Sequence, residues 1–260
     1  MRATRLLLSL ALLAAPAAAL AQSTPARDVH LAMGGSLAWD AGYLAVGGGL
    51  ALAGLLASPP TVDRAPFDGL GGRPWRPEVG LASDVVLWGG VAATVGLGVA
   101  VERWGRGVRG VTLLRAPLVL AESTAMALGL VSAVKVLVGE CRPRAWSDAA
   151  GRCASGERED RVSFPSGHTA ALSAMAGASL GMMLLPAGRP RAYWPLLVVA
   201  GALAATNLVL RVVAGAHNWV DTSVGLALGF GVGLGAAAAH VYEGPRLIVN
   251  AQGVGVAGTF

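Results

Sequence analysis

Residues 194–213 read WPLLVVAGALAATNLVLRVV, a run of 20 residues in which Arg211 is the only charged side chain. An α-helix needs about 20 apolar residues to cross the hydrocarbon core of a bilayer. Similar apolar stretches occupy about 41–57, 85–101, 113–138, 169–185 and 222–241. The chain is 54% hydrophobic and 13% charged, with a mean hydropathy of +0.59, which is outside the usual range of soluble domains of this length. The sequence therefore predicts an all-α membrane helix bundle of five to six apolar helices.

The N-terminal segment has the features of an export signal. Arg2 and Arg5 precede an apolar run that ends at Ala19-Leu20-Ala21, which fits a cleavage site of small residues. We interpret residues 1–21 as a signal peptide, with an uncleaved anchor helix as the alternative. The remaining chain divides into three parts: an N-terminal helix and external loop (22–82), a helix-bundle domain (83–242) and a C-terminal tail (243–260). Alternating apolar residues in the tail fit a short strand.

The charged residues indicate a membrane orientation and no nucleic-acid partner. The net charge is +5, but the arginines are scattered between apolar runs and form no basic face interleaved with aromatic residues. Two short basic segments are expected to face the cytoplasm, 103–109 and 189–191. The segment that follows the third apolar stretch, 139–164, then faces outward. The expected location is a bacterial-type inner (plasma) membrane, with the active face toward the periplasm or exterior.

Six crossing helices and a cleaved signal would reverse this orientation. We resolve the conflict by assuming that the first stretch, 41–57, does not cross the bilayer. It is short, begins beside Asp40 and contains Gly47-Gly48-Gly49, and we expect it to lie against the outer face or to re-enter. An uncleaved N-terminus with an additional span is a second arrangement that keeps the active face outside.

Three polar motifs stand at the ends of the apolar stretches. Residues 135–143 read KVLVGECRP, and they end the third stretch with the only lysine of the chain, Lys135, and with Arg142. Two cations at a helix end converge on one anion, or they extend toward the membrane surface without a ligand. Residues 164–169 read FPSGHT and open the fourth stretch, where a helix N-terminus and the Ser166 hydroxyl favour a phosphate. His168 lies beside this position and can donate a proton to a departing oxygen.

The third motif joins the fifth and sixth stretches, where residues 211–221 read RVVAGAHNWVD. His217 and Asp221 are four residues apart, which places them on one face of a helix that begins here. The carboxylate can then accept a proton from one imidazole nitrogen and leave the other as a nucleophile. The alternative is a buried His–Asp pair with a purely structural role.

Together the motifs resemble the signature of the type 2 phosphatidic-acid phosphatase superfamily, which is Lys-x6-Arg-Pro, Pro-Ser-Gly-His and Ser-Arg-x5-His-x3-Asp. The resemblance covers about residues 85–241, and it departs from the signature at Leu210, where the family usually has Ser. It implies a phosphatase without a metal ion or other cofactor. The phosphate-binding groups that it implies are Lys135, Arg142, Ser166, Gly167 and Arg211. It also implies that His217 attacks phosphorus, that Asp221 orients His217, and that His168 protonates the leaving group.

The implied partners are the lipid bilayer and a lipid phosphate or isoprenoid diphosphate substrate. A vanadate-dependent haloperoxidase has the same anion site but is soluble, which the apolar stretches disfavour. A non-catalytic lipid-phosphate-binding or transport protein would need the cations but neither a nucleophile nor an acid. Two further features are noted: Glu122 lies within the third stretch and should face the bundle interior, and Cys141 and Cys153 can form a disulfide outside the cell.

Overall fold

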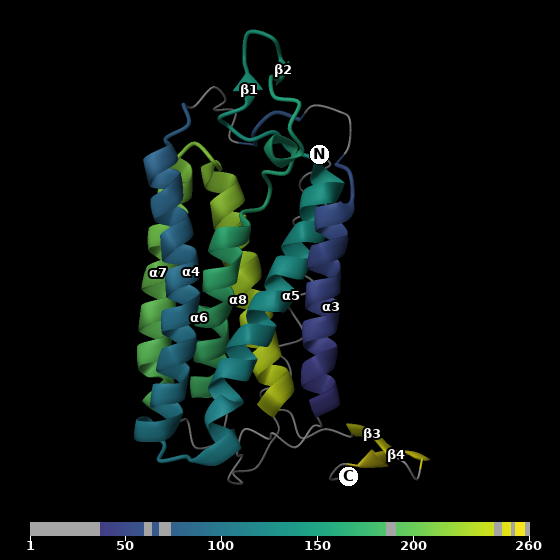
Figure 1. Ribbon diagram of the computed structural model, residues 1–260, viewed down its shortest axis with the longest axis vertical. Coiled ribbons are helices and arrows are strands. Elements are labelled where there is room, and N and C mark those ends of the chain that lie inside the picture. The colour runs from purple at the N-terminus through teal and green to yellow at the C-terminus, as the bar shows by residue number, and fades with distance from the viewer. Residues whose placement is uncertain are drawn as a thin grey trace.

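The computed structural model describes residues 37–59, 64–67, 74–185, 191–241, 246–250 and 253–257. Six α-helices account for most of them: α3 (Leu37–Leu56), α4 (Pro77–Ala100), α5 (Arg115–Val138), α6 (Gly167–Leu184), α7 (Trp194–Val213) and α8 (Trp219–Val241). The helices lie side by side with their long axes roughly aligned (Figure 1). The predicted all-α bundle is confirmed, and each apolar stretch forms one helix. The expected signal at 1–21 lies outside the described residues.

Short elements connect the helices. The end of α4 continues as a π-helical turn, η2 (Val101–Gly105), and 3-10 turns precede α5 and α7, namely η3 (Gly110–Leu114) and η5 (Arg191–Tyr193). The connection between α5 and α6 contains β1 (Trp146–Ser147), β2 (Arg152–Cys153) and the 3-10 turn η4 (Arg158–Arg161). The C-terminal tail forms an antiparallel hairpin of β3 (Arg246–Asn250) and β4 (Gly253–Ala257), so the strand expected there is present.

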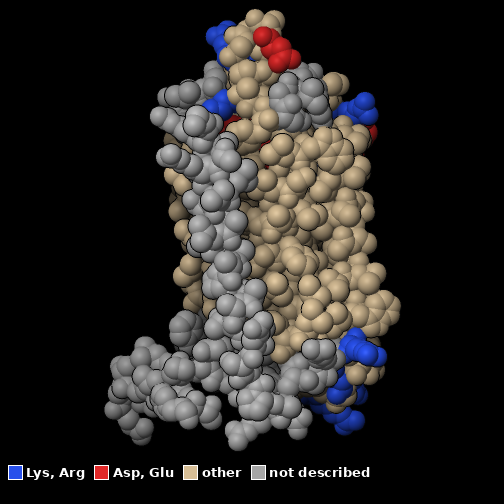
Figure 2. Space-filling model, turned by 180° about the vertical axis from the view of Figure 1, so that it is seen from behind, with Lys and Arg blue, Asp and Glu red and all other residues tan. Residues whose placement is uncertain are grey.

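Among the residues that the structure describes, four segments are long and apolar enough to cross a membrane: Pro77–Gly105, Thr112–Val138, Arg191–Val213 and Trp219–His240. They contain α4, α5, α7 and α8. On the face that Figure 2 shows, a broad belt without charge separates the two ends; Lys and Arg lie at both ends, and Asp and Glu lie at the upper end. This distribution fits a protein whose middle lies in hydrocarbon.

Glycine brings α8 against α6 over several turns. Cβ atoms built at Gly225, Gly229 and Gly233 would collide with the α6 backbone or its N-cap, at carbonyl oxygens of residues 166, 170 and 174. The prediction that this four-residue glycine spacing lets another helix approach closely is confirmed, and α6 is that helix. Because α6 begins at the second motif and α8 begins at the third, this contact also sets the separation of the two motifs.

The first helix lies elsewhere than we expected. A Cβ at Gly47 would meet the backbone of Ala125, and one at Gly54 would meet Ser132, so α3 runs parallel to α5 and packs along it. Figure 1 shows α3 upright beside α5, not across the end of the bundle. The structure thus differs from the re-entrant or surface position expected for 41–57. The physical reason is that glycines which weaken an isolated helix also allow close contact with a neighbour. The prediction that this stretch does not cross the bilayer stays a prediction, since its apolar part, Ala41–Leu56, is shorter than the four candidate spans.

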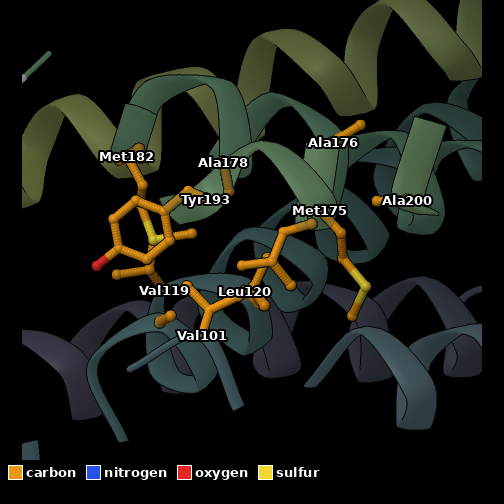
Figure 3. Packing of buried hydrophobic residues seen from close by; sticks show 12 residues of the cluster. Val101, Val119, Leu120, Met175, Ala176, Ala178, Met182, Tyr193 and Ala200 are labelled. Atoms are coloured by element: carbon orange, nitrogen blue, oxygen red, sulfur yellow. The ribbon is translucent and has the colours of Figure 1, made fainter. Parts of the chain in front are cut away.

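Apolar side chains from four helices fill the half of the bundle opposite the site end. Leu120 of α5, Met175 and Met182 of α6 and Tyr193 of η5 are fully buried and point toward one another (Figure 3). Small residues, including Ala200 of α7, complete this cluster, as expected for a chain with few aromatic residues. The cluster holds the α6–α7 connection against α4 and α5.

Glu122 faces the bundle interior, as predicted. Its Oε2 lies 2.6 Å from Nε2 of His240 on α8, and its side chain is fully buried. His240 is thus the partner that the sequence did not reveal. An ion pair or charged hydrogen bond of this kind compensates the cost of placing a carboxyl group within apolar helices.

Candidate active site

The three motifs meet at one end of the bundle, which we call the site end. The helices alternate in direction along the chain from α4 to α8, so the last turns of α5 and α7 and the first turns of α6 and α8 share this end (Figure 1). The long connection that contains β1 and β2 covers it. Four helix termini therefore surround one position, and each brings side chains from one of the predicted motifs.

His217 and Asp221 form the centre of the site. Nδ1 of His217 lies 3.1 Å from Oδ2 of Asp221, and both side chains are buried. The chain reaches His217 through Gly215, whose φ of 73° is in the left-handed region that favours glycine. With its proton on Nδ1 and directed at Asp221, the imidazole presents the Nε2 lone pair to the site. Nε2 lies 3.4 Å from Nη1 of Arg142.

Additional donors fix the Asp221 carboxylate. The Ser163 hydroxyl donates to Oδ2 at 2.5 Å, and the backbone N–H of Asn218 donates to the same oxygen at 3.3 Å. The Asn218 side chain also binds the backbone of Asp221, since its Oδ1 accepts a hydrogen bond from the Asp221 N–H at 2.8 Å. Because Asp221 is held from two sides, the orientation of His217 is held with it.

The three predicted cations lie around His217. Lys135 donates from Nζ to the carbonyl oxygens of Val162 and Ser163, at 2.6 and 2.8 Å. Arg142 donates from Nε to the Glu159 carbonyl at 2.8 Å and from Nη1 to that of Ala216 at 3.1 Å. These bonds fix both side chains on the connection that precedes α6 and on the loop that precedes α8.

Arg211 approaches from α7 and binds α4. Its Nη1 donates to the Ser83 hydroxyl at 3.0 Å and lies 3.4 Å from Oδ1 of Asp84. All three cations are close enough to act on His217. Burial, and then the charges of Arg142, Lys135 and Arg211, hold the pKa of the His217 imidazole well below its ordinary value. The imidazole is therefore neutral at neutral pH, which a nucleophile requires.

The Pro-Ser-Gly-His segment lies on the other side of the site. Ser166 is buried, its backbone N–H donates to the Asp221 carbonyl at 2.9 Å, and its hydroxyl lies 3.2 Å from that of Thr169. Gly167 begins α6, so the unpaired N–H groups of the first turn lie here. His168 extends toward α4, where its Nε2 lies 2.8 Å from Oδ1 of Asp84.

The eight predicted residues are thus brought to one end of the molecule, but sequence reasoning missed several of their partners. Asp84 and Ser83 stand at the start of the second apolar stretch, where a carboxylate is unusual, and that placement was the available signal. Ser163, which precedes the second motif directly, and Glu140, within the first motif, carried no signal of their own.

A disulfide closes the connection over the site. Cys141 and Cys153 are bonded, so the expected bridge is present, and it joins the first motif to β2. Arg144 follows the first motif, binds Asp160 at 2.9 Å and stacks on the ring of Trp75, with its guanidinium carbon 4.5 Å from the ring centroid. The connection between α5 and α6 is thereby fixed to the start of α4.

Within the described part of the chain, no three His, Cys, Asp or Glu side chains are grouped in a way that could hold a metal ion. Besides the Asp221 carboxylate, the charged side chains that act on His217 include the three cations, Arg142, Lys135 and Arg211.

These features define a class of protein: a membrane helix bundle in which a buried, neutral imidazole lies among three cations at one end. A sequence model of the PAP2 superfamily matches residues 116–245, which are 130 of the 260 residues, and the chain belongs to this superfamily. Superfamily members are phosphatases, which supports a phosphatase-type activity here. Comparisons with curated proteins and with solved structures gave no match. The matched region begins at α5, so it does not include Asp84 of α4.

Proposed function

We propose that this protein hydrolyses a lipid-linked phosphomonoester or diphosphate through a phosphohistidine on His217, without a metal ion. Lys135, Arg142 and Arg211 bind the phosphate oxygens, together with the first turn of α6. The Nε2 lone pair of His217 attacks phosphorus, and the bond from phosphorus to the leaving oxygen breaks. In the second step water attacks the phosphohistidine, which releases phosphate and restores the neutral imidazole.

The observation that carries this proposal is the direction of the His217 ring. Nδ1 faces the Asp221 carboxylate, and Nε2 faces Arg142 at 3.4 Å. Binding of an anion requires the cations alone. A buried carboxylate that orders the imidazole so that its free nitrogen faces a cation is the arrangement of a nucleophile, and it favours an enzyme over a binding or transport protein.

A lipid substrate is supported by the flank of α4 beside the leaving-group side of the site. Asp84 contacts His168, which we assign as the acid that protonates the leaving oxygen. Beside Asp84, Leu81, Val85 and Trp88 follow one another at spacings of four and three positions, which places them on one helical face, and each is between 63% and 68% exposed. An apolar chain attached to the leaving oxygen would find an apolar surface there, which continues into the uncharged belt.

The proposal is tested by phosphate release from lipid phosphates in detergent, with and without a chelator. We expect turnover to survive EDTA, and vanadate to inhibit competitively because its trigonal-bipyramidal form can bond to Nε2 of His217. Loss of turnover on chelation that a divalent ion restores would contradict metal independence. Bromide oxidation by the vanadate-loaded protein, without phosphatase activity, would favour the haloperoxidase-like alternative. Full activity of His217→Ala would exclude the phosphohistidine.

The lipid-binding flank is tested by Val85→Gln, with Val198→Gln on α7 as a control at a comparably exposed position. We expect Val85→Gln to raise KM for a long-chain lipid phosphate and to leave nitrophenyl phosphate unaffected. Equal effects of the two variants on both substrates would show that the α4 flank does not bind the chain.

A further inference from the structure

Glu140 is a buried carboxyl group that the proposed mechanism does not use. It stands between Lys135 and Arg142 in the first motif, just past the end of α5, and its side chain is fully buried. A buried carboxylate needs a cation or several donors to remain ionised. The side chains that Glu140 contacts therefore decide whether it carries a proton.

One oxygen of Glu140 is fully occupied as an acceptor. Oε1 accepts the backbone N–H of Phe67 and the side-chain amide of Asn218, both at 2.8 Å. The orientation of the Asn218 amide is fixed independently, because its Oδ1 accepts the Asp221 N–H. Asn218 thus presents its NH₂ group to Glu140, and Oε1 acts as a carbonyl oxygen.

The other oxygen receives no donor. Oε2 of Glu140 and Oδ1 of Asp221 are both buried, and neither has a hydrogen-bond partner among the described residues. Asn218 binds both residues, and the two carboxyl groups are close enough to act on each other electrostatically. Two carboxylates cannot share a hydrogen bond when both are ionised, since neither has a donor. A single proton between Oε2 and Oδ1 satisfies both atoms.

We propose that Glu140 is a protonated positioning residue that donates a hydrogen bond from Oε2 to Oδ1 of Asp221, and thereby holds Asp221 in place behind His217. Asp221 receives donors on both oxygens in this arrangement: Ser163 on Oδ2 and Glu140 on Oδ1. A chain of hydrogen bonds then runs from the backbone N–H of Phe67 through Glu140 and Asp221 to His217.

The electrostatic surroundings agree with a proton on Glu140. Burial, and then the charge of Asp221, raise the pKa of the Glu140 carboxyl to about 10. The segment that donates to Oε1 is also fixed in place, because the Arg64 carbonyl accepts the Cys141 N–H at 2.9 Å and the Phe67 ring meets Phe164 edge-on at 4.9 Å. Glu140 therefore couples the covering segment at 64–67 to the nucleophile.

The test compares Glu140→Gln with Glu140→Leu in the full-length protein in detergent, and it rests on the proposed phosphatase activity. Gln keeps the acceptor oxygen and replaces O–H by N–H, so it can still donate to Asp221, whereas Leu of similar size leaves Oδ1 without a donor. We expect Glu140→Leu to lower kcat for nitrophenyl phosphate about 10- to 100-fold, the effect of leaving one buried acceptor unsatisfied. Glu140→Gln should recover most of that loss.

A purely structural role would affect other quantities. Lys135, Arg142 and Arg211 are untouched by these variants, so inhibition by inorganic phosphate should change less than about threefold in Glu140→Leu, because the cations that bind it remain. Asp148→Leu, at an exposed acid of the same connection, is the matched control and should change neither quantity. Equal loss of kcat in Glu140→Gln and Glu140→Leu would overturn the proposal, because it would mean that Glu140 acts as an anion.

The proton itself is measured without any activity. At neutral pH the infrared spectrum of the wild-type protein should contain a protonated-carboxyl band that Glu140→Gln lacks, and absence of this band difference would overturn the proposal even if Glu140→Leu does not fold. A wild-type protein that releases no phosphate but shows the band would contradict the proposed function and leave the shared proton standing.

Discussion

His217 has to satisfy two requirements that oppose each other in water. A nucleophilic imidazole must be neutral, yet a phosphate-binding site must be strongly positive. The protein meets both because burial and the surrounding cations disfavour the imidazolium, while Nδ1 has a carboxylate partner that fixes the tautomer. In the proposed mechanism, the positive groups that bind the substrate would therefore also keep the nucleophile in its reactive form.

The lowered pKa of His217 predicts a pH dependence. The ordinary imidazole value is 6.5, and a lowered value keeps the ring neutral as the pH falls through 6.5, so the acid limb of kcat/KM due to His217 lies below that pH. Arg142→Ala removes the charge that lowers the His217 pKa most, so the limb should move to higher pH and KM should rise. Both proteins are measured with the same substrate, so the ionisation of the substrate contributes equally to the two pH profiles. An unchanged limb in Arg142→Ala would mean that Arg142 does not act on the nucleophile.

The two catalytic histidines should differ in their dependence on the leaving group. His168→Ala removes proton donation, which costs about 10²–10⁴-fold when the leaving oxygen is a lipid alkoxide. A nitrophenolate leaves without a proton, so its release should show a burst followed by slower hydrolysis of the phosphohistidine. Equal loss on both substrates without a burst would mean that His168 does not act as the acid.

Substitution of Asp84 should depend on the leaving group in the same way as substitution of His168, but with a smaller effect. Burial, and then the charge of Arg211, lower the pKa of the His168 imidazole to about 4, whereas the Asp84 carboxylate, which lies 2.8 Å from its Nε2, raises this pKa, so the proposed proton donor depends on Asp84. We therefore expect Asp84→Asn to slow lipid phosphate hydrolysis by about 10-fold, within the range of a general acid's contribution, and to spare the nitrophenyl burst. A loss confined to nitrophenyl phosphate would contradict this assignment.

Sequence predicted the residues of this site better than their partners. Lys135, Arg142 and the His217–Asp221 pair are recognisable because the motif spacing is fixed within single helix ends. Asp84 is remote in sequence, and its contact with His168 depends on how α4 packs against α6. The bond between Asp221 and Ser163 likewise depends on how the connection folds back over α8. Such contacts arise from packing, which an isolated sequence does not specify.

At the scale of elements, the α6–α8 contact determines the spacing of the site. Gly229→Ala should destabilise the bundle by about 1–3 kcal/mol, the usual cost of overpacking, because the new Cβ collides with the Ala170 carbonyl. Gly235→Ala on the same helix is the matched control, since a Cβ there meets nothing within 4 Å. Thermal unfolding in detergent measures both. Equal stability of the two variants would mean that the helices do not approach this closely.

The positions of the helices could be predicted from apolar stretches alone, but the packing of α3 could not. In the sequence alone, the glycines at 47–49 disfavour a crossing helix, since glycine weakens an isolated helix. In the structure Gly47 allows α3 to reach the backbone of α5. Whether a glycine breaks a helix or packs it depends on the neighbour, and a single sequence does not identify the neighbour.

At the scale of the whole molecule, the two ends differ in chemistry. The site end has the disulfide and the three cations of the site. The opposite end, which we call the basic end, has Arg103, Arg106 and Arg109 beside η2, and Arg106 donates to the Tyr193 hydroxyl at 2.6 Å across the start of α7. Helices that start at the basic end finish at the site, so a membrane orientation assigned to either end fixes the other.

The packing of α3 gives the last prediction, which concerns this orientation. Arg158, in the connection at the site end, donates to the Ala57 carbonyl at 3.1 and 2.8 Å, so α3 ends at the site and begins at the basic end. If arginine marks the cytoplasmic side, α3 starts inside the cell and crosses outward with α5. That is the arrangement with an uncleaved N-terminus, because after cleavage at residue 21 the segment before α3 would start outside.

Single cysteines labelled with an impermeant maleimide in intact cells test this arrangement. The two native cysteines are bonded to each other and do not react, so no cysteine-free background is needed. Ser58→Cys and Asp148→Cys, at the site end, should be labelled, whereas Leu37→Cys and Trp104→Cys, at the basic end, should be labelled only after permeabilisation. Labelling of both Leu37→Cys and Ser58→Cys from outside would mean that α3 does not cross the bilayer. Labelling of Trp104→Cys but not Asp148→Cys would place the active site in the cytoplasm, because an impermeant reagent reaches only the outer end of an aligned bundle.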